Sequence, residues 1–136
     1  MAKAVVKWIE GKTFMGIDST DHAVVLSSPS EGVGMKPSEL MLVALGACSS
    51  VDVVGILEKR KVTLTHYEVQ VSAEQDEDPP WTFRKIHLKY ILAGKDLNEK
   101  DVQKAIELSE GKYCSVAATL KGKAEITTEY VIEPEG

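Results

Sequence analysis

The sequence lacks the basic excess that proteins use to bind nucleic acids or anionic membrane surfaces. Its 136 residues contain 16 Lys and Arg against 21 Asp and Glu, which gives a formal net charge of -5, and the two signs are interspersed. A nucleic-acid-binding domain normally carries a basic patch or stripe, and a membrane-surface protein carries a polybasic cluster. We therefore expect neither a nucleic-acid partner nor a membrane partner.

Cysteine is equally scarce, and its spacing does not match the common metal motifs. Cys48 and Cys114 form no Cys-x-x-Cys pair, and His22, His66 and His87 lie in strand-like sequence without ligand spacing to either cysteine. We expect no metal and no cofactor. The chain opens with an alternating strand pattern instead of a basic, signal-like segment. This predicts a reducing cytoplasm, where a cysteine pair is more often redox-active, metal-binding or structural than a permanent disulfide.

What the sequence does contain is one long apolar stretch, residues 37–61, around which the chain is organised. Pro37 has the fixed φ that suits a first helical turn, and Glu39 lies where an acid stabilises the N-terminal end of the helix dipole. An ordinary surface helix shows one apolar stripe, so a helix that is apolar on nearly every face indicates burial within protein. The apolar positions are Leu40, Met41, Val43, Leu45, Val51, Val53, Val54, Ile56 and Leu57.

A membrane-spanning helix is the competing interpretation of this stretch. Residues 40–57 approach the roughly 18 to 20 residues that are needed to cross a bilayer. Ser49, Ser50 and Asp52 lie at mid-length, where polar groups are costly in lipid. We therefore favour a long central helix that protein surrounds.

The remaining chain alternates between strand and helix patterns. Period-2 alternation predicts strands, and Asn98 followed by Asp101 resembles a helix N-cap that begins a helix closed by Gly111. The length and the 43% hydrophobic content fit one domain, residues 1–136, of the α+β class in the order βββ-α-ββ-α-α-β. The predicted strands are Lys3–Ile9, Lys12–Asp18, His22–Ser28, His66–Glu74, Phe83–Leu92 and Lys123–Glu133, and the later helices are Asn98–Glu110 and Cys114–Lys121.

The two cysteines have opposite expected chemistry. Cys114 falls at the first turn of a helix, where unpaired N–H groups favour a thiolate, and Lys112 adds to this. Cys48 lies within an apolar helix, where burial raises a thiol pKa unless a cation or a hydrogen-bond donor is brought to it. Asp52, one turn along, would oppose ionisation of Cys48, although an N-cap or backbone partner on another element is the more common role for such a residue.

At these positions the chain resembles the OsmC/Ohr family of organic-hydroperoxide reductases, and in particular its OsmC-like branch. The resemblance extends to the predicted element order over essentially the whole chain. The matching residues are Pro37-Ser38-Glu39-Leu40-x-x-x-Ala44-x-Gly46-Ala47-Cys48 and Tyr113-Cys114-Ser115.

The resemblance implies an intertwined homodimer with the long helix at its centre and two sites at the subunit interface. It implies that Cys48 is the peroxidatic thiolate, which attacks the O–O bond of an organic hydroperoxide and becomes a sulfenic acid. Cys114 is then the resolving cysteine that forms a disulfide with Cys48, and an external dithiol, such as a lipoyl group, reduces the pair.

The chain departs from the family pattern at two positions. Family peroxidases lower the pKa of the peroxidatic thiol with an Arg from the N-terminal sheet, and here the only two are Arg60 and Arg84. The family's catalytic Glu directly follows the helix-starting Pro, whereas here that residue is Ser38. Glu39 comes one residue later, about 100° around a helix, so it is a candidate catalytic residue and also a candidate dipole-stabilising acid.

These departures lead us to expect slow turnover that rises towards pH 9. They also leave a rival function open. The chain would then be a dimeric binding module for a small lipophilic ligand, with weak or lost peroxidase activity.

Overall fold

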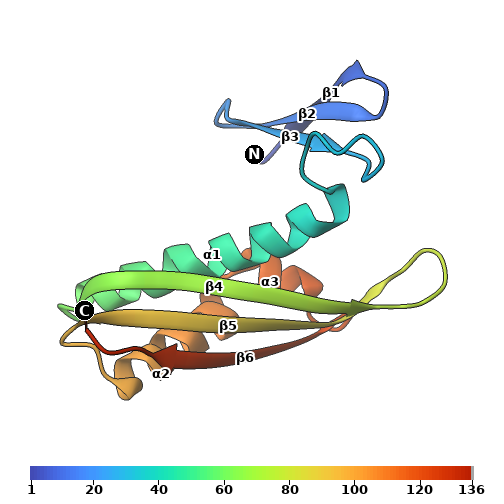
Figure 1. Cartoon of the computed structure of the whole chain (residues 1–136). Coiled ribbons are helices and arrows are strands. Elements are labelled where there is room, and N and C mark those ends of the chain that lie inside the picture. Colours follow the sequence, from blue (N-terminus) through green and yellow to red (C-terminus); the bar gives the residue numbers. More distant parts are fainter. Residues whose placement is uncertain (136) are drawn as a thin grey trace. The chain divides into compact units, whose positions relative to one another are not determined.

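The computed structural model describes residues 1–135, which form two compact units divided after Met41. In the first unit, strands β1 (Ala4–Glu10), β2 (Thr13–Asp18) and β3 (Ala23–Ser27) form an antiparallel sheet in the order β1-β2-β3 (Figure 1). The predicted three-stranded meander is therefore confirmed. Gly11, with a φ of 52°, makes the first turn, and its carbonyl accepts a hydrogen bond from the indole of Trp8 at 2.8 Å.

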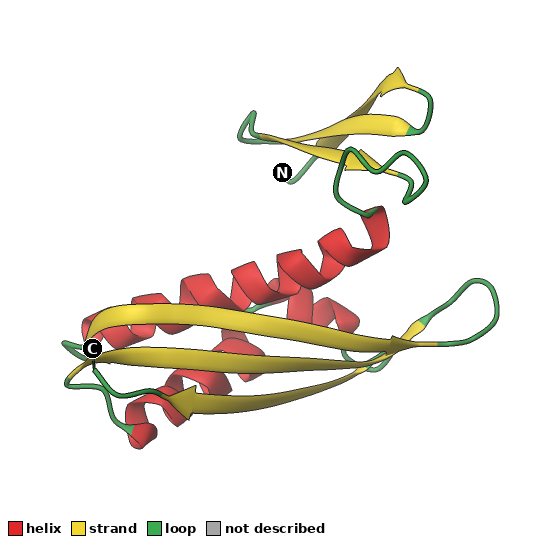
Figure 2. Ribbon diagram, in the orientation of Figure 1, coloured by secondary structure: helices red, strands yellow, loops and turns green. Residues whose placement is uncertain are grey.

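The second unit contains a second three-stranded sheet with its helices on one face (Figure 2). Strands β4 (Thr63–Gln75) and β5 (Phe83–Lys95) form the predicted hairpin, and β6 (Glu125–Ile132) pairs parallel to β5. The predicted inward face of β5 is confirmed, because Ile86, Leu88, Tyr90 and Leu92 are at most 2% exposed. Each fully buried aliphatic side chain of this kind contributes about 1.5–3 kcal/mol. The mixed α+β class is thus confirmed, whereas a single domain over residues 1–136 stays a prediction.

Helix α1 (Pro37–Lys59) begins at the predicted proline and runs into the second unit. There it buries Leu45, Val53 and Leu57 in the core, but it leaves Val43 49% and Val51 75% exposed. Gly46 allows close packing on the sheet, since a Cβ there would lie 3.1 Å from a methyl of Val71. The single chain therefore covers one side of this helix, and its complete enclosure by a second subunit stays a prediction.

By length and composition alone, α1 could also cross a membrane. Ser49 and Asp52, near its middle, hydrogen-bond with the hydroxyl of Ser109 on another element. A helix that packs against other protein elements requires hydrogen-bond partners within the protein for its buried polar groups. The contacts therefore favour the packed-helix interpretation.

The second helical region differs from the predicted one. Helix α2 (Glu99–Leu108) is capped by Asn98, whose side chain accepts from the N–H of Asp101 at 2.9 Å, as expected. The chain does not close at Gly111 but continues into one π-helical turn, η1 (Ser109–Tyr113), which leads to α3 (Ser115–Leu120). The reason is a bond from the N–H of Cys114 to the carbonyl of Ser109, 2.8 Å and five residues back. Hydrophobic periodicity does not encode such a turn, which is common near functional sites.

Candidate functional site

The packing of α1 and α3 on the same sheet brings the two cysteines together. Cys48 lies half-buried on α1, and Cys114, which is 2% exposed, is the N-cap residue of α3. Both are free thiols. The hydroxyl of Ser115 lies 4.0 Å from the Cys48 sulfur, and the neighbouring thiol of Cys114 lowers the pKa of Cys48 as a hydrogen-bond donor. Two residues that are 66 positions apart in the chain therefore form one thiol pair.

The surroundings of Cys48 favour its thiolate. Burial by itself raises the pKa of Cys48, but hydrogen bonds from the N–H of Val116, the thiol of Cys114 and both the hydroxyl and the N–H of Ser115 outweigh it. The pKa of Cys48 consequently lies below its usual value. Donors that bond the charged form stabilise that form, and here all of them come from the three residues 114–116.

The surroundings of Cys114 favour its protonated thiol. Burial raises the pKa of Cys114, and the neighbouring Cys48 raises it further, whereas the N–H of Ala117, which donates to the Cys114 sulfur at 3.4 Å, lowers it. The net direction is upward. The protonated Cys114 can therefore donate its hydrogen to the Cys48 thiolate.

The helix position of each cysteine, taken alone, favoured the opposite polarity, whereas the family resemblance made Cys48 the thiolate. Cys114 does lie at a helix start, as predicted, and Cys48 has the hydrogen-bond donors that the sequence analysis named as the condition for its ionisation. The catalytic roles of the two cysteines stay a prediction. The first N–H groups of α3 serve Cys48 across the site, and Cys114 is nearly fully buried. The sequence shows no proximity of Cys48 to α3, so it could state only the condition, a nearby donor, under which Cys48 would ionise.

A chain of hydroxyl groups behind the thiols was not predicted. The hydroxyl of Tyr90 lies 2.6 Å from that of Ser49, which lies 3.0 Å from that of Ser109. The hydroxyl of Ser109 is also 2.9 Å from a carboxylate oxygen of Asp52. Asp52 thus has a structural partner on another element, but this partner is a side-chain hydroxyl and not the predicted N-cap or backbone group. The sequence did contain a signal for this hydroxyl network. Ser49 and Asp52 are polar residues three positions apart, and they therefore lie on one face of an otherwise apolar helix.

The two arginines and Glu39 pair with charged residues and not with the cysteines. Arg60 pairs with Asp101 and Arg84 with Asp76, each at 2.9 Å. Glu39, in the first unit, is exposed and lies 3.5 Å from the ammonium of Lys36. This exposed pair fits the dipole-stabilising interpretation of Glu39, and such pairs contribute little to stability, about 0–1 kcal/mol.

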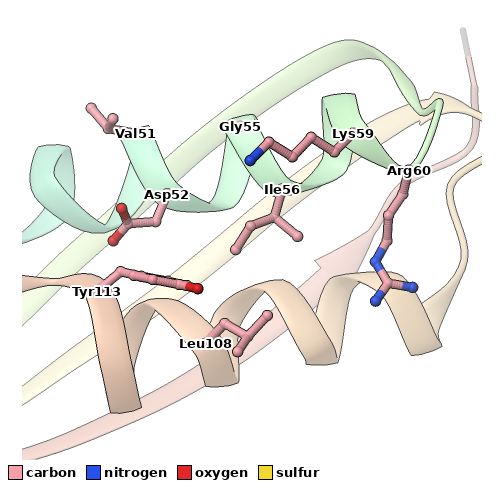
Figure 3. Close-up of a pocket in the computed structure, with 8 residues that line it drawn as sticks. All are labelled: Val51, Asp52, Gly55, Ile56, Lys59, Arg60, Leu108 and Tyr113. Carbon is pink, nitrogen blue, oxygen red and sulfur yellow. The ribbon is translucent and has the colours of Figure 1, made fainter.

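A groove of about 460 Å³ lies between α1 and the segment from α2 to η1 (Figure 3). Asp52 and Tyr113 lie at one end and Arg60 at the other, with Ile56 and Leu108 between them (Figure 3). Because Tyr113 directly precedes Cys114, one end of the groove adjoins the cysteine-bearing turn. Over residues 1–135, no cluster of three or more His, Cys, Asp or Glu is arranged to hold a metal ion.

Comparisons with known proteins agree with this architecture. The chain is 38% identical over 130 residues to Protein YhfA of Escherichia coli strain K12, a match that covers 96% of this chain and 97% of that protein. The crystal structure of a hypothetical protein from Aquifex aeolicus VF5 has a TM-score of 0.89 and 26% identity and covers 100% of this chain and 98% of its own.

The organic hydroperoxide resistance protein OhrB of Bacillus subtilis has a TM-score of 0.63 and 18% identity, over 96% of this chain and 98% of its own. That similarity concerns the fold alone. The model of the family described as OsmC-like protein matches residues 29–129. The chain therefore belongs to the OsmC-like protein family.

Proposed function

We propose that this protein is a thiol-dependent peroxidase that reduces organic hydroperoxides with Cys48 and Cys114. The observation that carries the proposal is the pair of neighbouring thiols, in which the pKa of Cys48 is lowered and that of Cys114 is raised. A nucleophilic thiolate beside a protonated partner is what the first step requires. Membership of a family whose fold is shared with a hydroperoxide resistance protein supports the choice of substrate.

In the first step, the Cys48 thiolate attacks the terminal oxygen of the hydroperoxide and the O–O bond breaks. Cys48 is oxidised to a sulfenic acid, and the departing alkoxide takes a proton and leaves as the alcohol. The protonated thiol of Cys114, which donates to Cys48, is one source of that proton.

In the second step, the sulfur of Cys114 attacks the sulfenic sulfur of Cys48. A disulfide forms as the S–O bond of the sulfenic acid breaks, and the hydroxide that leaves takes a proton from solvent and becomes water. An external dithiol then reduces the disulfide by thiol exchange and is itself oxidised to its cyclic disulfide. The nearness of the two thiols in the reduced protein suits this closure without a large movement.

We also propose that the working form is a homodimer. In the first unit β1 exposes Val5, Val6 and Trp8, and in the second unit α1 exposes Val43 and Val51. Exposed apolar groups of this extent mark surfaces that a partner covers. A partner would also account for a helix whose sequence is apolar on nearly all sides.

Glu39 is a candidate catalytic residue within this proposal. Glu39→Gln separates its two roles. Removing a catalytic carboxylate lowers peroxide turnover, whereas removing a dipole-stabilising carboxylate lowers only the stability of the protein, by about 0.3–1 kcal/mol. Peroxide turnover and urea unfolding of the same preparation measure both effects.

The direct test is consumption of cumene hydroperoxide with a dithiol reductant, compared between wild type, Cys48→Ser and Cys114→Ser. We expect no activity in Cys48→Ser. In Cys114→Ser we expect no intramolecular disulfide, so turnover slows to the rate at which the dithiol itself attacks the Cys48 sulfenic acid. Wild type that consumes no peroxide would reject the proposal.

The groove of about 460 Å³ is the observation that favours the rival function of a binding module for a small lipophilic ligand, because its lining includes the apolar Val51, Ile56 and Leu108 beside the charged Asp52, Lys59 and Arg60. Such a module would bind a lipophilic fluorescent probe equally well after Cys48→Ser and would show no dithiol-dependent turnover. Probe titration alongside the peroxide assay distinguishes the two functions.

A further inference from the structure

Ser109 makes two sets of contacts that connect the cysteines. Its side chain, which is fully buried, reaches Ser49 and Asp52 on α1, and Ser49 directly follows Cys48. Its carbonyl oxygen accepts the N–H of Cys114 at 2.8 Å and so closes the π-helical turn. One residue therefore links the backbone beside the first thiol to the backbone of the second.

The hydroxyl of Ser109 is the donor towards both of its side-chain partners on α1, the carboxylate of Asp52 and the hydroxyl of Ser49. A hydroxyl group has a single proton, and a carboxylate accepts a stronger hydrogen bond than another hydroxyl does, so Asp52 is the stronger acceptor of the two. The hydroxyl of Ser49 also lies 2.6 Å from that of Tyr90. Burial raises the pKa of Tyr90, so Tyr90 keeps its proton. In residues 1–135, no buried side-chain nitrogen or oxygen lacks a hydrogen-bond partner.

We propose that Ser109 is a positioning residue that holds the turn carrying Cys114, and the donor groups that follow it, against α1 beside Cys48. The inference rests on the proposed function, because the positioning has a catalytic consequence only if these two thiols react in sequence. All the donors to Cys48 lie in residues 114–116, directly after the turn that Ser109 closes. The hydroxyl of Ser115 is already 4.0 Å from the sulfur, so a small displacement of the turn removes that donor.

A purely structural role for Ser109 predicts a different result. Ser109 would then contribute one satisfied buried hydrogen-bond network, and its loss would lower stability without changing the reactivity of Cys48. The chain offers a matched control for this case. The hydroxyl of Tyr67 on β4 donates to that of Ser50 on α1 at 3.0 Å. This hydrogen bond also connects another element of the unit to α1, but it does not involve the turn that carries Cys114.

The experiment compares wild type, Ser109→Ala and Tyr67→Phe by two readouts. The first is the rate at which iodoacetamide alkylates Cys48 at pH 7, which follows its thiolate fraction. The second is the rate at which diamide converts the two thiols to a disulfide and is itself reduced to the hydrazine. In Ser109→Ala we expect alkylation to slow by roughly fivefold and disulfide formation by about tenfold. In Tyr67→Phe both rates stay within about twofold of wild type, although both variants melt at a lower temperature.

Equal rates in Ser109→Ala and wild type, or equal losses in both variants, would overturn the positioning role. If Ser109→Ala does not fold, Ser49→Ala takes its place, since it removes the same hydroxyl contact from the helix side, and the same comparison decides. Neither readout uses peroxide. A wild type that is inactive with peroxide therefore refutes the proposed function, while the alkylation and diamide rates still decide the role of Ser109.

Discussion

The thiol of Cys114 should control how much of Cys48 is ionised, and replacing Cys114 tests this directly. Cys48 has four donors, and the thiol of Cys114 is one of them. Cys114→Ala removes that donor, whereas Cys114→Ser replaces it with a hydroxyl donor. The alkylation rate of Cys48 at a fixed pH below its pKa is proportional to its thiolate fraction.

The size of the effect follows from the kind of donor. A hydrogen bond to a charged group contributes about 1.5–3 kcal/mol, but an S–H group donates weakly and Cys48 is half-exposed, so water replaces part of the loss. About 1 kcal/mol remains, and since one pKa unit corresponds to about 1.36 kcal/mol, the thiolate fraction falls roughly fivefold. We therefore expect Cys114→Ala to alkylate roughly fivefold more slowly than wild type and Cys114→Ser to stay within about twofold.

The assay is iodoacetamide alkylation at pH 7 with mass spectrometry of the peptide that contains Cys48. Urea unfolding of the same two variants is an internal control for the position of residue 114 at the N-cap of α3. The sulfur of Cys114 caps α3 by accepting from the N–H of Ala117, and Ser is a preferred N-cap, so Cys114→Ser should be about 1 kcal/mol more stable than Cys114→Ala. Alkylation that is as fast in Cys114→Ala as in Cys114→Ser would refute the reasoning that Cys114 donates to Cys48.

Three further predictions follow from the fold and the site. Leu57→Ala, at a position that is 0% exposed, should lower the free energy of unfolding by about 2–5 kcal/mol, and a change below 1 kcal/mol in urea unfolding would contradict the described core. Val51→Asp, at a position that is 75% exposed in the single chain, should leave the circular dichroism spectrum unchanged but convert a dimer to a monomer in sedimentation; an unchanged dimer would remove α1 from the interface. Because the pKa of Cys48 is lowered, the thiolate is fully formed above that pKa and is lost as the pH falls through it, so peroxidase activity should level off at a lower pH than the reaction of free cysteine; activity that keeps rising to pH 9 would contradict this.

The element order could be predicted from the sequence because each element has a strong local signal. Alternation places Ile86, Leu88 and Tyr90 on the inward face of β5, and the helix start at Pro37 follows from the fixed φ of proline. These signals lie within a few residues of the feature that they specify. The same holds for the N-cap of α2 at Asn98.

The polarity of the thiol pair could not be predicted in the same way, because it depends on contacts between distant residues. Cys48 is in an apolar helix, and no local pattern shows that the N–H groups of Ser115 and Val116 lie beside it. The π-helical turn at Ser109 depends on a single bond to the N–H of Cys114, which no periodicity encodes. Tyr90 was identified as an inward-facing strand residue, but the partner of its hydroxyl, Ser49, is 41 residues away.

The scarcity of arginine now has a different consequence from the one that the sequence suggested. A guanidinium activates a thiolate through its charge, and that attraction is screened by salt. Here both guanidinium groups are paired with carboxylates, and the groups that lower the pKa of Cys48 include two backbone N–H groups. A backbone N–H carries no titratable charge, and the packing of its segment fixes its direction. The ionisation of Cys48 should therefore depend on the placement of residues 114–116 more than on ionic strength, which makes the turn closed by Ser109 the part of the molecule on which its reactivity depends.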